Sequence, residues 1–205
     1  MKKYPTIQLI IIAVILALLP LSTEAASIYL ESSRTTMAAG DTIFVTVKMD
    51  TEGAALNTVD GTIALKSPKS TVVVNEFSLA NSSFGLWPRT PSLSADGRTI
   101  SFVGGVPGGF NIKGATLFKI VITGQKEGIL TISPENIAAF LNDGTGMKVP
   151  VHSKDLIVHV DAKKAGMTPI NDWNSVVSGD LTPPESFIVV LGQDKTLYDG
   201  KKFAF

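Results

Sequence analysis

The feature that most constrains the fold of this chain is a strict two-residue alternation of apolar and polar side chains. It is clearest in DTIFVTVKMD, residues 41–50, and follows directly on a glycine-aspartate turn signal. The apolar positions that share one face of this stretch are Ile43, Val45, Val47 and Met49. Because successive side chains of a strand point to opposite faces, the pattern indicates a β-strand with one buried face.

Similar short runs recur along the chain at intervals of about ten to twenty residues. They are VDGTIALKS (59–67), STVVVNEFS (70–78), RTISFVGG (98–105), ATLFKIVITG (115–124), GILTISPE (128–135) and DLIVHVDA (155–162). No long stretch after residue 26 has a helical period, and only PENIAAFLNDG, residues 134–144, suits one short helical turn. Many short strands separated by turns predict an all-β fold, an antiparallel sandwich or jelly roll.

The first 25 residues have the organisation of a secretory signal. Lys2 and Lys3 precede an apolar run over residues 7–19, and small residues flank Glu24 before the expected cleavage after Ala25. The run is shorter than the roughly 20 apolar residues of a spanning helix. We therefore expect a signal peptide over residues 1–25 and a secreted or cell-surface protein; an uncleaved N-terminal anchor is the alternative.

Charge and cysteine content narrow the classes of partner and site. The chain has 18 Lys and Arg residues against 18 Asp and Glu residues, so it has no basic excess to attract nucleic acid. It contains no cysteine, which excludes disulfides and thiolate metal ligands.

The glycine-rich stretch TISFVGGVPGGF, residues 99–110, raises the question of a phosphate-binding loop. Its order fails the dinucleotide pattern G-x-G-x-x-G and lacks the Lys-Ser/Thr of a P-loop. Both motifs also need a helix immediately downstream, whereas residues 111–123 lead back into a strand. The stretch is therefore predicted to be a corner or bulge where two backbones pass closely.

The sequence offers no convincing catalytic or metal-binding constellation. His159 lies between two inward-facing valines and is expected to point outward from a strand, and His152 is the only other histidine. No G-x-S-x-G nucleophile motif is present, and the carboxylates are scattered. NDGTG, residues 142–146, favours a glycine-rich turn over a calcium loop. We predict no catalytic residue, no metal ligand and no cofactor.

The candidate ligand-binding residues are Phe84, Trp87 and Arg89, in SSFGLWPRTPSLS, residues 82–94. An exposed tryptophan beside a phenylalanine makes a stacking platform for sugar rings or an anchor for a protein, and an arginine can hydrogen-bond or stack beside it. The alternative is that Trp87 closes one end of the core. The two prolines of the stretch argue against a central strand. Trp173 has the same ambiguity without supporting neighbours.

Several segments together resemble the cohesin-like family, whose superfamily also contains the family 2 and family 3 carbohydrate-binding modules. The segments are LW and PSLS ahead of GRTISFVGG, then PGGF, LFKIVI, KEG and LNDGTG, with the earlier AAGDTIFVTVKMD resembling the family's opening strand. The resemblance covers residues 27–160. It implies a jelly-roll sandwich of about nine strands without catalytic residues. It also implies binding of dockerin modules through one sheet face, in complexes for polysaccharide catabolism, or carbohydrate binding.

One departure from the family pattern matters for the choice of contact residues. Where cellulosomal members have a Tyr-Asp-Pro-like turn, this chain has LKSPKS, residues 65–70, and keeps only the proline. No dockerin-contacting residue is therefore carried over.

The C-terminal part changes character after residue 162. Residues 163–180 are polar and rich in turn formers, which predicts a linker. DLTPPESFIVVLGQDKTLYDGKKFAF, residues 180–205, resembles the opening of an immunoglobulin-like module that follows such domains, in some cases with a membrane anchor further on. We expect residues 181–205 to form a strand or hairpin that is the truncated start of that module, because a lone hairpin is not stable by itself.

The sequence thus predicts an exported, non-catalytic binding module over residues 26–162, with a polysaccharide or a dockerin-like protein module as its partner. A structural immunoglobulin-like spacer without a ligand is the alternative. A hydrolase ranks third and would require two carboxylates about 5–10 Å apart in a groove.

Overall fold

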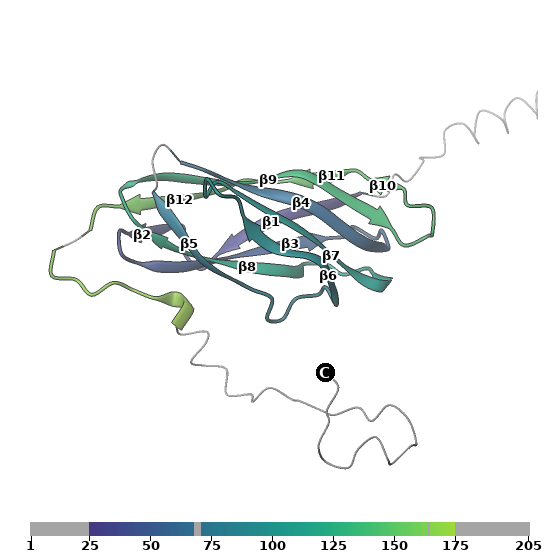
Figure 1. Cartoon of the computed structure of the whole chain (residues 1–205), viewed down its shortest axis with the longest axis horizontal. Helices are drawn as coiled ribbons and strands as arrows, with labels where there is room; N and C mark the ends of the chain where they lie inside the picture. The colour runs from purple at the N-terminus through teal and green to yellow at the C-terminus, as the bar shows by residue number, and fades with distance from the viewer. Residues whose placement is uncertain (1–24, 68–70, 164, 175–205) are drawn as a thin grey trace, which may run out of the picture.

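Two β-sheets packed face to face form the body of the protein, seen as two layers in Figure 1. The structure is a computed structural model that describes residues 25–67, 71–163 and 165–174. The expected signal peptide, apart from Ala25, and the expected module over residues 181–205 lie outside the described residues. The all-β sandwich prediction is confirmed.

The smaller sheet has five strands in the order β11-β1-β3-β8-β5. Their bounds are β11 Val151–Ser153, β1 Ala26–Ser32, β3 Thr42–Asp50, β8 Ala115–Gly124 and β5 Val72–Ser78. The larger sheet has the order β2-β12-β9-β4-β7-β6, with β10 added beside β9. Its bounds are β2 Thr36–Ala38, β12 Leu156–Asp161, β9 Gly128–Leu141, β4 Leu56–Lys66, β7 Thr99–Phe110, β6 Leu86–Leu93 and β10 Lys148–Val149.

Two of the strand pairs are parallel, which departs from the expected antiparallel arrangement. β1 runs parallel to β11 in the smaller sheet, and β2 runs parallel to β12 in the larger one. The segments 26–38 and 151–161 therefore lie side by side, and both cross from the first sheet to the second. Parallel neighbours cannot be joined by a tight hairpin, and here most of the domain connects them.

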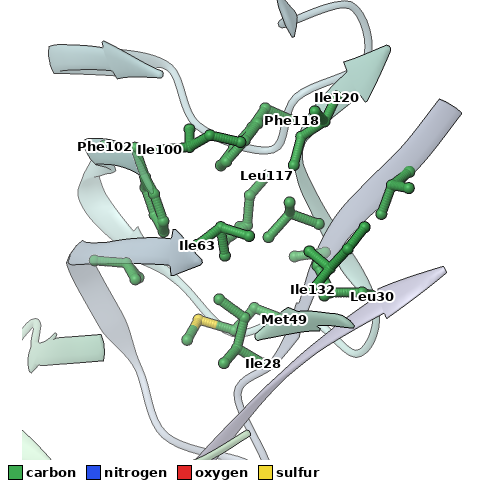
Figure 2. Packing of buried hydrophobic residues seen from close by; sticks show 14 of the residues in the cluster. Ile28, Leu30, Met49, Ile63, Ile100, Phe102, Leu117, Phe118, Ile120 and Ile132 are labelled. Carbon is green, nitrogen blue, oxygen red and sulfur yellow. The ribbon is translucent and has the colours of Figure 1, made fainter. Parts of the chain in front are cut away.

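The core lies between the sheets and is entirely apolar around two aromatic rings. Phe102 of β7 and Phe118 of β8 are both fully buried, and their ring centroids lie 5.0 Å apart across the interface between the sheets. Figure 2 shows them with aliphatic side chains from both layers, including Ile63 and Met49. The predicted inward face of β3 is buried at all four positions, which confirms the alternation.

The glycine-rich stretch is an irregular part of β7 that continues to Phe110, and β8 follows it without a helix. The register between β4 and β7 shifts between Leu56 and Thr58, opposite this stretch, so the predicted bulge is confirmed. Gly108 and Gly109 both have positive φ, near 85°, which only glycine adopts without strain. The phosphate-loop reading is excluded by the strand that follows.

The short helical turn expected over residues 134–144 is wrong. β9 runs through this stretch as far as Leu141 and pairs with β4 on one side and β10 on the other. Asn136, at φ 51°, lies where the β4 register shifts, and this bulge interrupts the alternation that would have identified the strand. Pairing with two neighbours overrides the local preference.

Replacing Gly105 with alanine should destabilise the fold by about 2 kcal/mol, since the new Cβ would meet the backbone carbonyl of Asn57 on the neighbouring strand. Gly85→Ala is the matched control, because open space surrounds its Cβ position and neither glycine has a positive φ. The control should change the free energy of unfolding by less than about 1 kcal/mol. Urea unfolding of both variants measures the difference; equal effects would contradict the close approach of β7 to β4.

Candidate functional site

The outer face of the larger sheet is the widest surface of regular structure available for a partner. We name the outward side chains of β12, β9, β4, β7 and β6 the open face. Register places these side chains in rows, with Asp60 opposite Val103 and Thr62 opposite Ser101. The members are Ile157 and His159, Ile129, Thr131 and Glu135, Asp60, Thr62 and Lys66, Ser101 and Val103, and Arg89 and Ser92.

An ion pair lies in the middle of the open face. Lys66 Nζ of β4 is 2.6 Å from Glu135 Oε1 of β9, and this hydrogen bond raises the pKa of Lys66 above its ordinary value. The register places Ala64 and Ser133 between the two charged residues. Ser133 is 3% exposed and its Oγ has no hydrogen-bond partner among the described residues. The ion pair therefore lies over Ala64 and Ser133, the two small residues between Lys66 and Glu135.

Exposed apolar side chains also lie on the same sheet, two of them as diagonal neighbours on β12 and β9. Ile129 and Ile157 are each 50% exposed, and Leu86 at the β6 edge is 55% exposed. His159 is exposed beside Ile129, as the alternation predicted. A face that mixes single apolar side chains with charges has the composition of a non-obligate interface.

The outer face of the smaller sheet differs because residues 169–174, here named the clasp, lie against it. The ring of Trp173 is 5.8 Å from that of Phe44 on β3, and the amide of Thr42 donates to the carbonyl of Ile170. The sequence showed no neighbour for Trp173, and the structure places it against Phe44. The clasp belongs to the segment expected to be a linker.

The three predicted ligand-binding residues do not form one exposed platform. Phe84 is only 5% exposed, and its ring packs 5.2 Å from Trp87 and 5.6 Å from Phe110. Trp87 is half-buried and lies 6.2 Å from the core ring of Phe118. Arg89 is exposed and stands apart on the open face, opposite Val103. The two rings close one end of the core, which was the alternative, and only Arg89 reaches the open face.

The turn at residues 142–146 uses its acidic side chain locally. Asp143 Oδ1 accepts hydrogen bonds from the amide and the hydroxyl of Thr145, at 2.9 and 2.6 Å. These bonds lower the pKa of the Asp143 carboxyl. Within the described residues, no three His, Asp or Glu side chains gather closely enough to hold a metal ion, and no helix is long and apolar enough to cross a membrane.

Sequence reasoning missed the open face because no motif marks it. Its residues are single polar positions from five strands that are far apart in the chain, and only the sheet order brings them together. The one available signal was the polar half of each alternating strand, which indicates exposure to solvent but does not show which strands are neighbours.

Trp87→Ala should lower the free energy of unfolding by about 3 kcal/mol, because it removes a ring packed against Phe84 and Phe118. Arg89→Ala, two residues along the same edge strand, should stay within about 0.5 kcal/mol of the parent since its side chain is exposed. Chemical denaturation monitored by far-UV circular dichroism compares them. A Trp87→Ala variant as stable as the parent would show that the ring is not part of the core.

Comparison with known proteins identifies the fold. No protein-family model and no curated protein sequence matches the chain. Solved structures do match: a cohesin module of a family 33 glycoside hydrolase from Clostridium perfringens aligns with TM-score 0.56 and 10% identity, covering 69% of this chain and 100% of that module. A non-cellulosomal cohesin from the archaeon Archaeoglobus fulgidus aligns with TM-score 0.52 and 15% identity, covering 66% of this chain and 91% of that one.

A third similar structure comes from a type I cohesin-dockerin complex of Clostridium thermocellum, with TM-score 0.53 and 11% identity, covering 70% of this chain and 98% of the matched one. The sandwich of this protein therefore has the fold of a cohesin module, which confirms the resemblance found in the sequence as far as the fold is concerned.

Proposed function

We propose that this protein is a non-catalytic docking module that binds a dockerin-like protein module through the open face. The fold supports the proposal, since one of the similar structures was solved as a cohesin-dockerin complex. The observation that carries it is the contrast between the two outer faces: the clasp lies on the smaller sheet, whereas among the described residues no such segment covers the open face.

The size of the open face suits a protein partner. The central strand β4 has 11 residues. Five strands about 4.8 Å apart, with this length at about 3.3 Å per residue, give a surface of about 24 by 36 Å. A stable protein–protein interface buries about 800 Å² on each partner, and the open face provides this area. Its hollow beside Lys66, Thr99 and Ile129 is wide and shallow. A flat surface of this kind favours another folded module over a small molecule.

The chemistry of the face favours a protein over a polysaccharide. A sugar-binding platform needs exposed aromatic rings, and Phe84 is buried. The open face instead offers the Lys66–Glu135 pair, Asp60 and Arg89, with the exposed Ile129 and Ile157 on the side of β9 and β12. Charges of both signs give orientation and specificity to docking, and the apolar side chains supply the buried contact area. With the signal expected over residues 1–25, docking would take place outside the cell.

Asp60→Arg should abolish or strongly weaken this docking. Asp60 is exposed on the central strand β4, so the change places a long side chain of opposite charge in the middle of the proposed interface. We expect Kd to rise at least tenfold, equivalent to about 1.4 kcal/mol. The measurement is biolayer interferometry of the full chain against a panel of purified dockerin modules, with insoluble cellulose and a glycan array as the carbohydrate arm.

The matched control is Glu76→Arg, which reverses an exposed acidic residue on β5 of the other sheet and should leave Kd unchanged. Binding to a dockerin that Asp60→Arg weakens and Glu76→Arg preserves would support the proposal. Binding only to glycans, binding to nothing, or equal losses in both variants would contradict it.

A further inference from the structure

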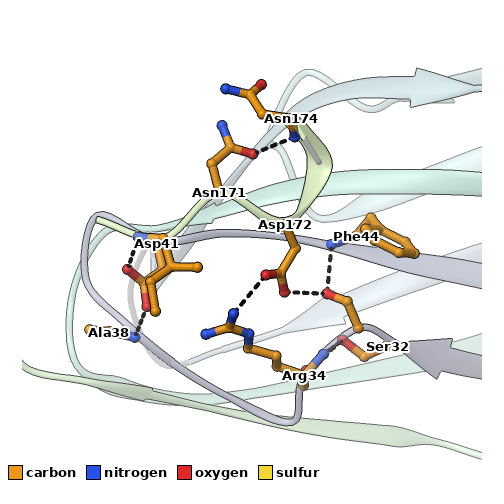
Figure 3. A network of polar contacts seen from close by, with 10 residues as sticks. Ser32, Arg34, Ala38, Asp41, Phe44, Asn171, Asp172 and Asn174 are labelled. Atoms are coloured by element: carbon orange, nitrogen blue, oxygen red, sulfur yellow. Dashed lines mark hydrogen bonds and ion pairs between the residues drawn. The ribbon is translucent and has the colours of Figure 1, made fainter. Parts of the chain in front are cut away.

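We propose that the clasp fixes residue 174, the point from which the chain continues, on the outer face of the smaller sheet, on the side of the sandwich opposite the open face. Three independent contacts hold the clasp: a backbone contact at the start of β3, a partly buried ion pair, and an aromatic cluster. Figure 3 shows the first two around Asp41 and Asp172.

The backbone contact is organised by Asp41, which is only 7% exposed. One carboxylate oxygen, Oδ2, accepts from the amide of Ala38 at 2.9 Å and so closes the turn between β2 and β3. The other, Oδ1, accepts from the amide of Ile170 at 2.8 Å, and the amide of Thr42 donates to the Ile170 carbonyl at 2.8 Å. The buried carboxylate of Asp41 therefore holds the turn between β2 and β3 with one oxygen and binds the clasp with the other, so both oxygens accept a hydrogen bond.

The ion pair joins the clasp to the segment between β1 and β2. Arg34 Nη2 lies 2.8 Å from Asp172 Oδ1, and the hydroxyl of Ser33 donates to Asp172 Oδ2 at 2.9 Å. The side chain of Asp172 is 15% exposed, so this pair is better shielded than an ordinary surface pair. The side chain of Asn171 accepts from the amide of Asn174 at 3.0 Å and caps the turn that presents Asp172.

The aromatic cluster closes the clasp over the middle of the sheet. Lys119 of β8 places its ammonium 5.9 Å from the Phe44 ring and 5.8 Å from the Trp173 ring, within cation–π range of both. Val121 is the cross-strand neighbour of Phe44 and points outward from the core, yet it is only 1% exposed. Val121 therefore lies beside the Phe44 ring against which Trp173 packs.

The clasp would restrict how far the next residues of the chain can move. A closed clasp keeps residue 178 within about 14 Å of residue 174, whereas a chain released at residue 163 would let residue 178 travel up to about 50 Å. A following module would thus be held away from the open face and would leave it clear for docking. This last consequence rests on the proposed function; the fastening itself does not.

A spin label tests the fastening directly in the full chain. The chain has no cysteine, so Ser178→Cys gives a single site for a nitroxide. We expect stronger paramagnetic broadening of amide signals on β3 and β8 than on β4 and β9, because the sheets are about 10 Å apart, the broadening falls steeply with distance and the label is held on one side. The double variant Asp172→Ala, Trp173→Ala should reduce the broadening on β3 and β8 at least threefold.

Met167→Ala is the control, because Met167 lies just ahead of the clasp and is 60% exposed. This variant should leave the broadening unchanged. Hydrogen exchange gives a second measurement: the amides of Thr42 and Ile170 should exchange at least tenfold faster in the double variant. Equal broadening of both sheets in the parent, or no response to the double variant, would overturn the proposal. No partner is present in either measurement, so the result is separate from the outcome of the dockerin panel.

Discussion

The contact between Phe102 and Phe118 across the two sheets is the interaction on which the rest of the structure depends. Their ring centroids lie 5.0 Å apart and the ring planes are inclined by 60°, an edge-to-face geometry that aromatic pairs favour. Both side chains are fully buried. Because the inward side chains of both sheets are used for this core, the outward side chains of the strands are the ones that face solvent or the clasp. The two outer faces therefore distinguish one side of the sandwich from the other.

The two outer faces are unequal, and this asymmetry follows from short stretches of sequence. The clasp is fixed by a handful of polar and aromatic side chains that cover part of the smaller sheet. The larger sheet keeps a face of charged side chains with the exposed pair Ile129 and Ile157. Under the proposed function, docking would use the larger sheet, because the clasp covers part of the smaller one.

Local patterns predicted most of the individual strands. The alternation in residues 115–124 coincides with β8, and the glycines of residues 104–109 mark the irregular part of β7. Alternation also predicted the outward direction of His159. These features depend on the side-chain period of a strand and on glycine backbone freedom, which the sequence contains locally.

The features that escaped prediction depend on contacts between distant segments. The C-terminal half of β9 was missed because a bulge at Asn136 breaks its period. The inward packing of Trp87, left open between two alternatives, follows from the irregular pairing of β6 with β7. The neighbours of Trp173 are Phe44 of β3, 129 residues earlier in the chain, and Lys119 of β8, 54 residues earlier, and no local pattern indicates them.

Solvent accessibility measured by NMR with a neutral gadolinium chelate tests the inequality of the faces most directly. Val121 and Ile157 both point outward, from opposite sheets, and are 1% and 50% exposed. The methyl signals of Ile157 should be strongly broadened by the chelate, while those of Val121 should remain sharp. Equal broadening of the two would show that the smaller sheet is as open as the larger one and would contradict this account.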